Sequence, residues 1–130
     1  MLRREILLGL AGAAVLGMTG CGRQVLTVQE ASELPADKLR GCIKRAAQRR
    51  HWRIIRDEPG RMRVKYVKGE HILVADVVYD NKGFTITPVK EGSTLINADG
   101  TAHRKVNQWT SNLSQTIRDE ESKVIIRQQK

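Results

Sequence analysis

The strongest constraint on the fold is a run of strand-like segments closed by tight turns between Trp52 and Val89. Apolar and basic residues alternate along Arg61–Tyr66, as in a strand with one buried and one exposed face. Turn-forming residues separate the segments at Glu58-Pro59-Gly60, Gly69-Glu70 and Asp80-Asn81-Lys82-Gly83. Because these connections are short, the sequence predicts an antiparallel β-meander of three to four strands.

Helical spacing flanks this region on both sides. Between Pro35 and Arg50, apolar residues recur on one helical face: Leu39, Cys42, Ile43, Ala46 and Ala47. A second set begins after Thr101, the expected N-cap, with Val106, Trp109, Leu113, Thr116 and Ile117. This order predicts a two-layer α+β domain in which an N-terminal and a C-terminal helix cover one face of the sheet.

The N-terminus has the pattern of a secretory signal peptide. Arg3 and Arg4 precede an apolar stretch of about 14 residues, which is shorter than the ~20 that a membrane-spanning helix needs. Cys21 directly follows Gly20, as in bacterial lipoproteins, where this thiol receives a diacylglycerol. A plain cleaved signal and a core helix are the alternatives, and the basic start fits general secretory export better than twin-arginine export.

These patterns divide the chain into four parts. We expect a signal peptide over residues 1–20, a lipidated N-terminus and tether over 21–32, one domain over 33–121, and a disordered tail over 122–130. The predicted location is a bacterial membrane, facing the periplasm. Gly22 after the lipidated cysteine, where Asp would favour retention, indicates the outer membrane. The covalent lipid on Cys21 is the only cofactor expected.

Cysteine content and charge restrict the chemistry further. Once Cys21 is acylated, Cys42 has no partner for a disulfide, and its place on a helical apolar stripe predicts a buried core residue. The chain carries a formal net charge of +9. Arg40, Lys44, Arg61, Arg63 and Lys65 are candidates for one basic face that binds an anionic lipid or an envelope protein; a merely solvated surface is the alternative. Export makes nucleic acid an unexpected partner, and the oligomeric state stays open.

Three further hypotheses concern other kinds of activity. Ser93 and His103, oriented by Asp80 or Asp99, are the components of a small hydrolase, although no strained nucleophile turn surrounds Ser93. The three histidines are too far apart in sequence to indicate a metal site. An exposed strand edge could pair with a partner sheet. A non-enzymatic binding or assembly module is therefore the leading expectation, and the Ser93–His103 hydrolase is the alternative.

A succession of short motifs between Lys38 and Ile117 is similar to a known pattern. It comprises Pro59-Gly60, His71, Asp76-Val77-Val78-Tyr79, Ser93-Thr94-Leu95, His103 and Asn107-Gln108-Trp109. In this order the chain resembles a family of small, functionally uncharacterised lipoproteins of proteobacteria. The resemblance implies a lipid-anchored periplasmic α+β domain and implies no activity. Ala102 and Val106 depart from the pattern, where the family has a larger apolar residue and Tyr.

Overall fold

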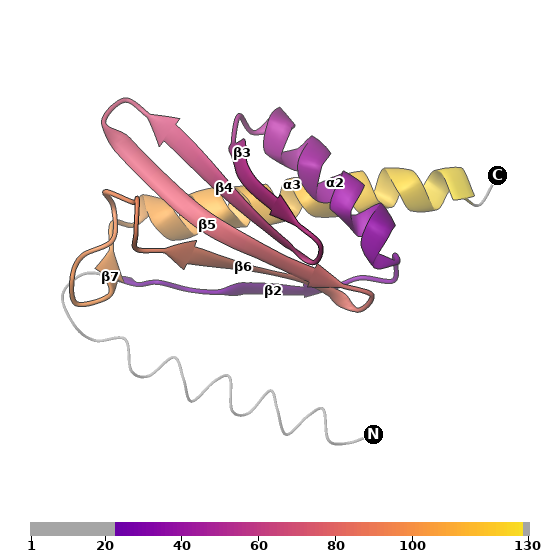
Figure 1. The fold of residues 1–130 in the computed structure, drawn as a ribbon, viewed down its shortest axis with the longest axis horizontal. Coiled ribbons are helices and arrows are strands. Elements are labelled where there is room, and N and C mark those ends of the chain that lie inside the picture. The colour runs from indigo at the N-terminus through magenta and orange to yellow at the C-terminus, as the bar shows by residue number, and fades with distance from the viewer. Residues whose placement is uncertain (1–22, 129–130) are drawn as a thin grey trace, which may run out of the picture.

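The predicted meander forms four strands of a five-stranded antiparallel sheet with the order β2-β6-β5-β4-β3 (Figure 1). The computed structural model describes residues 23–128. The strands of this sheet are β2 (Val28–Ala31), β3 (Arg53–Glu58), β4 (Arg61–Lys68), β5 (His71–Asp80) and β6 (Gly83–Val89). Two helices, α2 (Ala36–Arg49) and α3 (Lys105–Gln128), pack on one face. The α+β prediction is confirmed, with one strand more than expected.

Each hairpin turn lies where the turn residues predicted it. Gly60 and Gly69 have φ values of 80° and 62°, a left-handed conformation that glycine adopts at little cost. In the β5–β6 turn, Asp80 Oδ1 accepts hydrogen bonds from the backbone N–H groups of Lys82 (2.8 Å) and Gly83 (3.2 Å). The local sequence therefore sets the register of the meander.

The predicted tether over residues 21–32 is wrong for the part that the structure describes. β2 pairs with β6, and a short strand β1 (Arg23–Gln24) pairs with β7 (Thr101–Ala102). Two strands thus precede the helix that was expected to come first. β2 is short and half polar, and a partner strand more than 50 residues away satisfies its backbone groups. The signal segment 1–20, Cys21 and Gly22 lie outside the described residues.

The predicted disordered tail is also wrong over residues 122–128. α3 continues to Gln128, because Val124 extends the buried face that Leu113 and Ile117 begin. Residues 129 and 130 lie outside the described residues. Thr101 is in β7 and does not cap the helix. His103 takes that role, since its Nδ1 accepts a hydrogen bond from the Lys105 backbone N–H at 3.1 Å.

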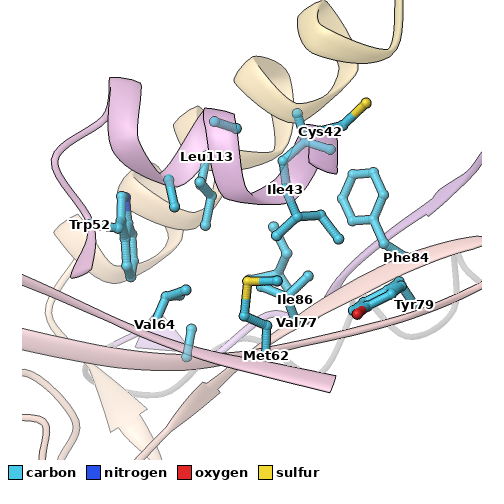
Figure 2. Close-up of a cluster of buried hydrophobic side chains, with 14 of the residues drawn as sticks. Cys42, Ile43, Trp52, Met62, Val64, Val77, Tyr79, Phe84, Ile86 and Leu113 are labelled. Carbon is cyan, nitrogen blue, oxygen red and sulfur yellow. The ribbon is translucent and has the colours of Figure 1, made fainter. Parts of the chain in front are cut away.

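The core lies between the sheet and the two helices. Figure 2 shows Ile43 of α2 facing Met62, Val77 and Ile86 of the sheet, and all four side chains are buried. Cys42 is completely buried, as predicted, and burial raises the pKa of its thiol. With no second cysteine beside it among the described residues, packing supplies the stability of the domain.

Candidate functional site

The five residues predicted to form one basic face lie on two different surfaces. Arg61, Arg63 and Lys65 alternate with the buried residues of β4, so they lie on the sheet face opposite the helices, called here the open sheet face. Arg40 and Lys44 belong to α2, on the covered side. The structure therefore does not bring the two groups together.

Four of these five cations are paired with carboxylates. Arg40 Nη2 lies 2.6 Å and Lys44 Nζ 3.6 Å from Asp57 Oδ2 at the end of β3. On the open sheet face, Arg63 makes a two-point contact with Asp76, with Nε–Oδ1 at 2.7 Å and Nη2–Oδ2 at 3.0 Å.

Arg61 adds a longer contact to Asp76 Oδ2, at 3.4 Å. Within residues 23–128, Lys65 alone of the five has no carboxylate within ion-pair distance. The open sheet face has less free positive charge than its sequence suggests.

The carboxylates in these pairs have shifted acidities. Hydrogen bonds from Arg63 hold the pKa of Asp76 below its ordinary value, against the opposing effect of burial. The Arg40 guanidinium lowers the pKa of Asp57 in the same way. Both pairs therefore stay ionised at neutral pH and act as structural links.

Ser93 and His103 are both engaged in structural hydrogen bonds. The Ser93 hydroxyl donates to the Val89 carbonyl oxygen at 2.6 Å and accepts from the Val74 backbone N–H at 2.8 Å. His103 caps α3 and lies beside His71, with 5.8 Å between the ring centroids. In the described part of the chain no hydrogen bond joins Ser93 to His103, the pair that the hydrolase alternative requires.

The side chains of Asp80 and Asp99 likewise accept hydrogen bonds within their own loops. Asp99 Oδ1 accepts hydrogen bonds from the backbone N–H and the hydroxyl of Thr101, at 2.9 and 2.6 Å.

Among residues 23–128 no group of three or more histidine, cysteine, aspartate or glutamate side chains could hold a metal ion. The described helices include none that is long and apolar enough to cross a bilayer.

A different site lies where the end of α2, the end of β4 and the first turns of α3 meet. Three aromatic side chains form its wall: Tyr66 lies between Trp52 and Trp109, with centroid distances of 5.3 and 4.7 Å. Both tryptophans are core residues, with 5% and 9% of their surface exposed, and Tyr66 is half-buried. We call this hollow, with a volume of about 360 Å³, the aromatic hollow.

The aromatic hollow is lined by two arginines and a lysine, together with the imidazole of His51. Arg50, His51 and Lys68 line it together with Arg49, and the polar groups of Gln108 and Asn112 complete the rim. Arg49 is neutralised by Asp119 and Glu120, each at 2.8 Å. Arg50 Nε donates to the Thr116 hydroxyl at 2.8 Å, and no carboxylate within residues 23–128 lies within ion-pair distance of Arg50. Among the described residues, no carboxylate lines this hollow, which favours an anionic ligand.

The backbone at His51 is unusual. His51 has φ = 66°, the left-handed conformation that glycine ordinarily provides after a helix. The helix end is closed by hydrogen bonds from the His51 and Trp52 N–H groups to the carbonyls of Gln48 and Ala47. A non-glycine residue in this conformation costs about 1–2 kcal/mol. The same turn that stores this strain directs Trp52 and His51 to the aromatic hollow.

Sequence reasoning missed the aromatic hollow because its parts come from separate segments. Trp52 and Trp109 belong to the core, and Tyr66 packs against it. Their position beside Arg50, His51 and Lys68 depends on how α2, β4 and α3 meet. A glycine after α2 would have predicted a left-handed residue at the helix end, whereas His51 at that position gives no such indication.

No known family model matches the chain, and no curated protein is significantly similar to it. The site must therefore be interpreted from its own geometry.

Proposed function

We propose that the protein is a lipid-anchored binding module of the bacterial envelope. In this proposal the thiol of Cys21 carries the lipid, the domain faces the periplasm, and the outer membrane is the favoured location. The support is the signal pattern that ends at Cys21, together with the resemblance to small proteobacterial lipoproteins. Mass spectrometry of the membrane-extracted protein tests the anchor: a diacylglycerol adduct is expected on Cys21, and its absence would refute this part.

We further propose that the aromatic hollow binds an anionic group of an envelope component. The proposal rests on three aromatic rings that meet Arg50, His51 and Lys68 in a hollow with no carboxylate among its described lining residues. Aromatic walls offer apolar contact to a ring-shaped ligand, and the charges of Arg50 and Lys68 neutralise phosphate or carboxylate. A phosphorylated or acidic sugar has both features.

The two tryptophans of the chain both line the hollow, so intrinsic fluorescence reports on it directly. The purified protein in detergent micelles is titrated with glucose 6-phosphate and, as a neutral probe, with glucose. We expect a saturable fluorescence change with the phosphorylated sugar and a much weaker response to glucose. Equal responses to both sugars would contradict an anion site.

Charge reversal tests the assignment of residues. Lys68→Glu is expected to weaken binding of the phosphorylated probe at least tenfold, which corresponds to about 1.4 kcal/mol. Lys82→Glu, in the exposed β5–β6 turn, makes the same charge change away from the hollow and is the matched control. Equal losses in both variants would mean that net charge alone is responsible, and would refute the proposed site.

A further inference from the structure

The folded domain begins very close to the proposed lipid. Arg23 of β1 pairs with Ala102 of β7. Two peptide units separate Cys21 from Arg23, which limits the distance between their Cα atoms to about 7.6 Å, twice the Cα–Cα spacing. A lipid on Cys21 would therefore hold this part of the domain at the surface of the bilayer.

Further contacts fix the segment that follows β1. The Asn107 side chain of α3 donates from Nδ2 to the Gln24 carbonyl oxygen at 2.9 Å, and its Oδ1 accepts from the Leu26 N–H at 3.0 Å. After Leu26 the chain enters β2, which is paired along its whole length with β6. The N-terminal segment is thus part of the fold, and it cannot act as a flexible spacer without losing these hydrogen bonds.

The surface around this attachment point has the properties of a membrane contact. Leu26 is an exposed large apolar side chain, with 53% of its surface accessible. Arg104 is exposed and Lys105 half-buried at the start of α3. Neither cation has a carboxylate within ion-pair distance in the described part of the chain. β7, the beginning of β2 and the beginning of α3 lie at the same end of the molecule (Figure 1).

We propose that this end of the domain docks directly on a bilayer that contains anionic phospholipids. Leu26 enters the interfacial region, and Arg104 and Lys105 contact the phosphate groups. We call Leu26, Arg104 and Lys105 the docking end. The β5–β6 turn and the C-terminal end of α3, at the opposite end in Figure 1, then point away from the membrane. This inference rests on the proposed lipidation of Cys21 and adds a fixed orientation to it.

Spin labels at two ends of the molecule test the orientation. The lipidated protein is reconstituted in vesicles of phosphatidylethanolamine and phosphatidylglycerol. It carries a nitroxide on Thr27→Cys, next to Leu26, or on Lys82→Cys, in the far turn. Cys42 is completely buried and does not compete for the label. We expect the label at position 27 to be shielded from a water-soluble relaxation agent several-fold more than the label at position 82. Equal access at both positions would overturn the proposal.

The charged part of the docking end is tested by reversal. Arg104→Glu with Lys105→Glu is expected to return the label at position 27 to the accessibility of the far turn. The control, Lys38→Glu with Lys82→Glu, makes the same charge change on exposed residues away from the docking end and should leave the shielding intact. Equal shielding in the reversed and original proteins would refute a role for the two cations.

Two further measurements separate the possible failures. Vesicles of phosphatidylcholine alone should give less shielding than the anionic vesicles, and identical shielding would refute anionic recognition. Mass spectrometry of each sample reports the lipid on Cys21. A missing lipid would refute the proposed anchor, whereas a lipidated protein with an accessible label at position 27 would refute only the docking end.

Discussion

Asp76 and Glu121 are both almost completely buried, yet their surroundings act on their charges in opposite directions. Hydrogen bonds from Arg63 lower the pKa of Asp76. For Glu121, desolvation by burial dominates and raises the pKa, and its Oε2 has no hydrogen-bond partner within residues 23–128. Asp76 is thus favoured as a carboxylate and Glu121 as a neutral acid.

These shifts predict opposite effects on stability. The contribution of Asp76 is present above its unfolded pKa of about 3.9 and is lost as the pH falls through the lower folded value. The favourable contribution of Glu121 is present below its unfolded pKa of about 4.3 and is lost as the pH rises through the raised folded value. At pH 7, Asp76→Asn should lower the free energy of unfolding by about 2 kcal/mol, whereas Glu121→Gln should raise it.

Urea unfolding between pH 3 and pH 8 checks both signs. The difference between Asp76→Asn and the original protein should shrink only below about pH 4, as the pH falls towards 3. The gain from Glu121→Gln should disappear at higher pH, as the pH falls from the raised folded pKa of Glu121 towards its unfolded value of about 4.3. Asp80→Asn, in an exposed turn without an ion pair in the described region, controls for the loss of a carboxylate. A loss of stability at pH 7 in Glu121→Gln would contradict the assigned environment.

At the scale of elements, the last turns of α3 belong to the fold. Val124 is 9% exposed and joins the core, whereas Ile126, two residues later, is 56% exposed. Val124→Asp should therefore destabilise the domain by 2 kcal/mol or more, since it places a charge on a buried helical face. Ile126→Asp is the matched control, with an expected change within about 0.5 kcal/mol. Chemical denaturation compares the two, and equal effects would show that this end of α3 does not pack.

The elements that sequence predicts are those with a strong local pattern. β4 was identified from the alternation of Met62 and Val64 with arginines, and its turns from Gly60 and Gly69. The strand β2 was not predicted because Val28–Ala31 is short and half polar. Its strand conformation comes from pairing with β6. That pairing is specified by Gly83, where a Cβ would lie 2.9 Å from Ala31 Cα and closer still to the Glu30 carbonyl oxygen.

Surfaces were harder to predict than elements. Arg61 and Arg63 were correctly expected on an exposed strand face, but Asp76 pairs with both from the neighbouring strand. Similarly, no local sequence pattern indicates that Lys68 and Trp109 line the same hollow. Net charge can be counted from composition, whereas free charge depends on cross-strand partners.

At the scale of the whole molecule, the two helices are linked to each other as well as to the sheet. Arg45 Nε lies 3.0 Å and Arg49 Nη1 2.8 Å from the buried carboxylate of Glu120, which joins α2 to α3. Hydrogen bonds from these arginines lower the pKa of Glu120 although burial opposes them. We therefore expect the two helices to leave the sheet together, which would expose the whole core.

Cys42 provides a probe of that opening. Its side chain is completely buried on α2, and burial raises the pKa of the thiol, so a thiol reagent should reach it only when the helices leave the sheet. We expect the rate of Cys42 labelling to increase with urea in parallel with global unfolding. Ser122→Cys, on the exposed face of α3, should label rapidly without denaturant. A labelling rate of Cys42 that does not depend on urea would show that α2 opens locally, and would contradict a single cooperative core.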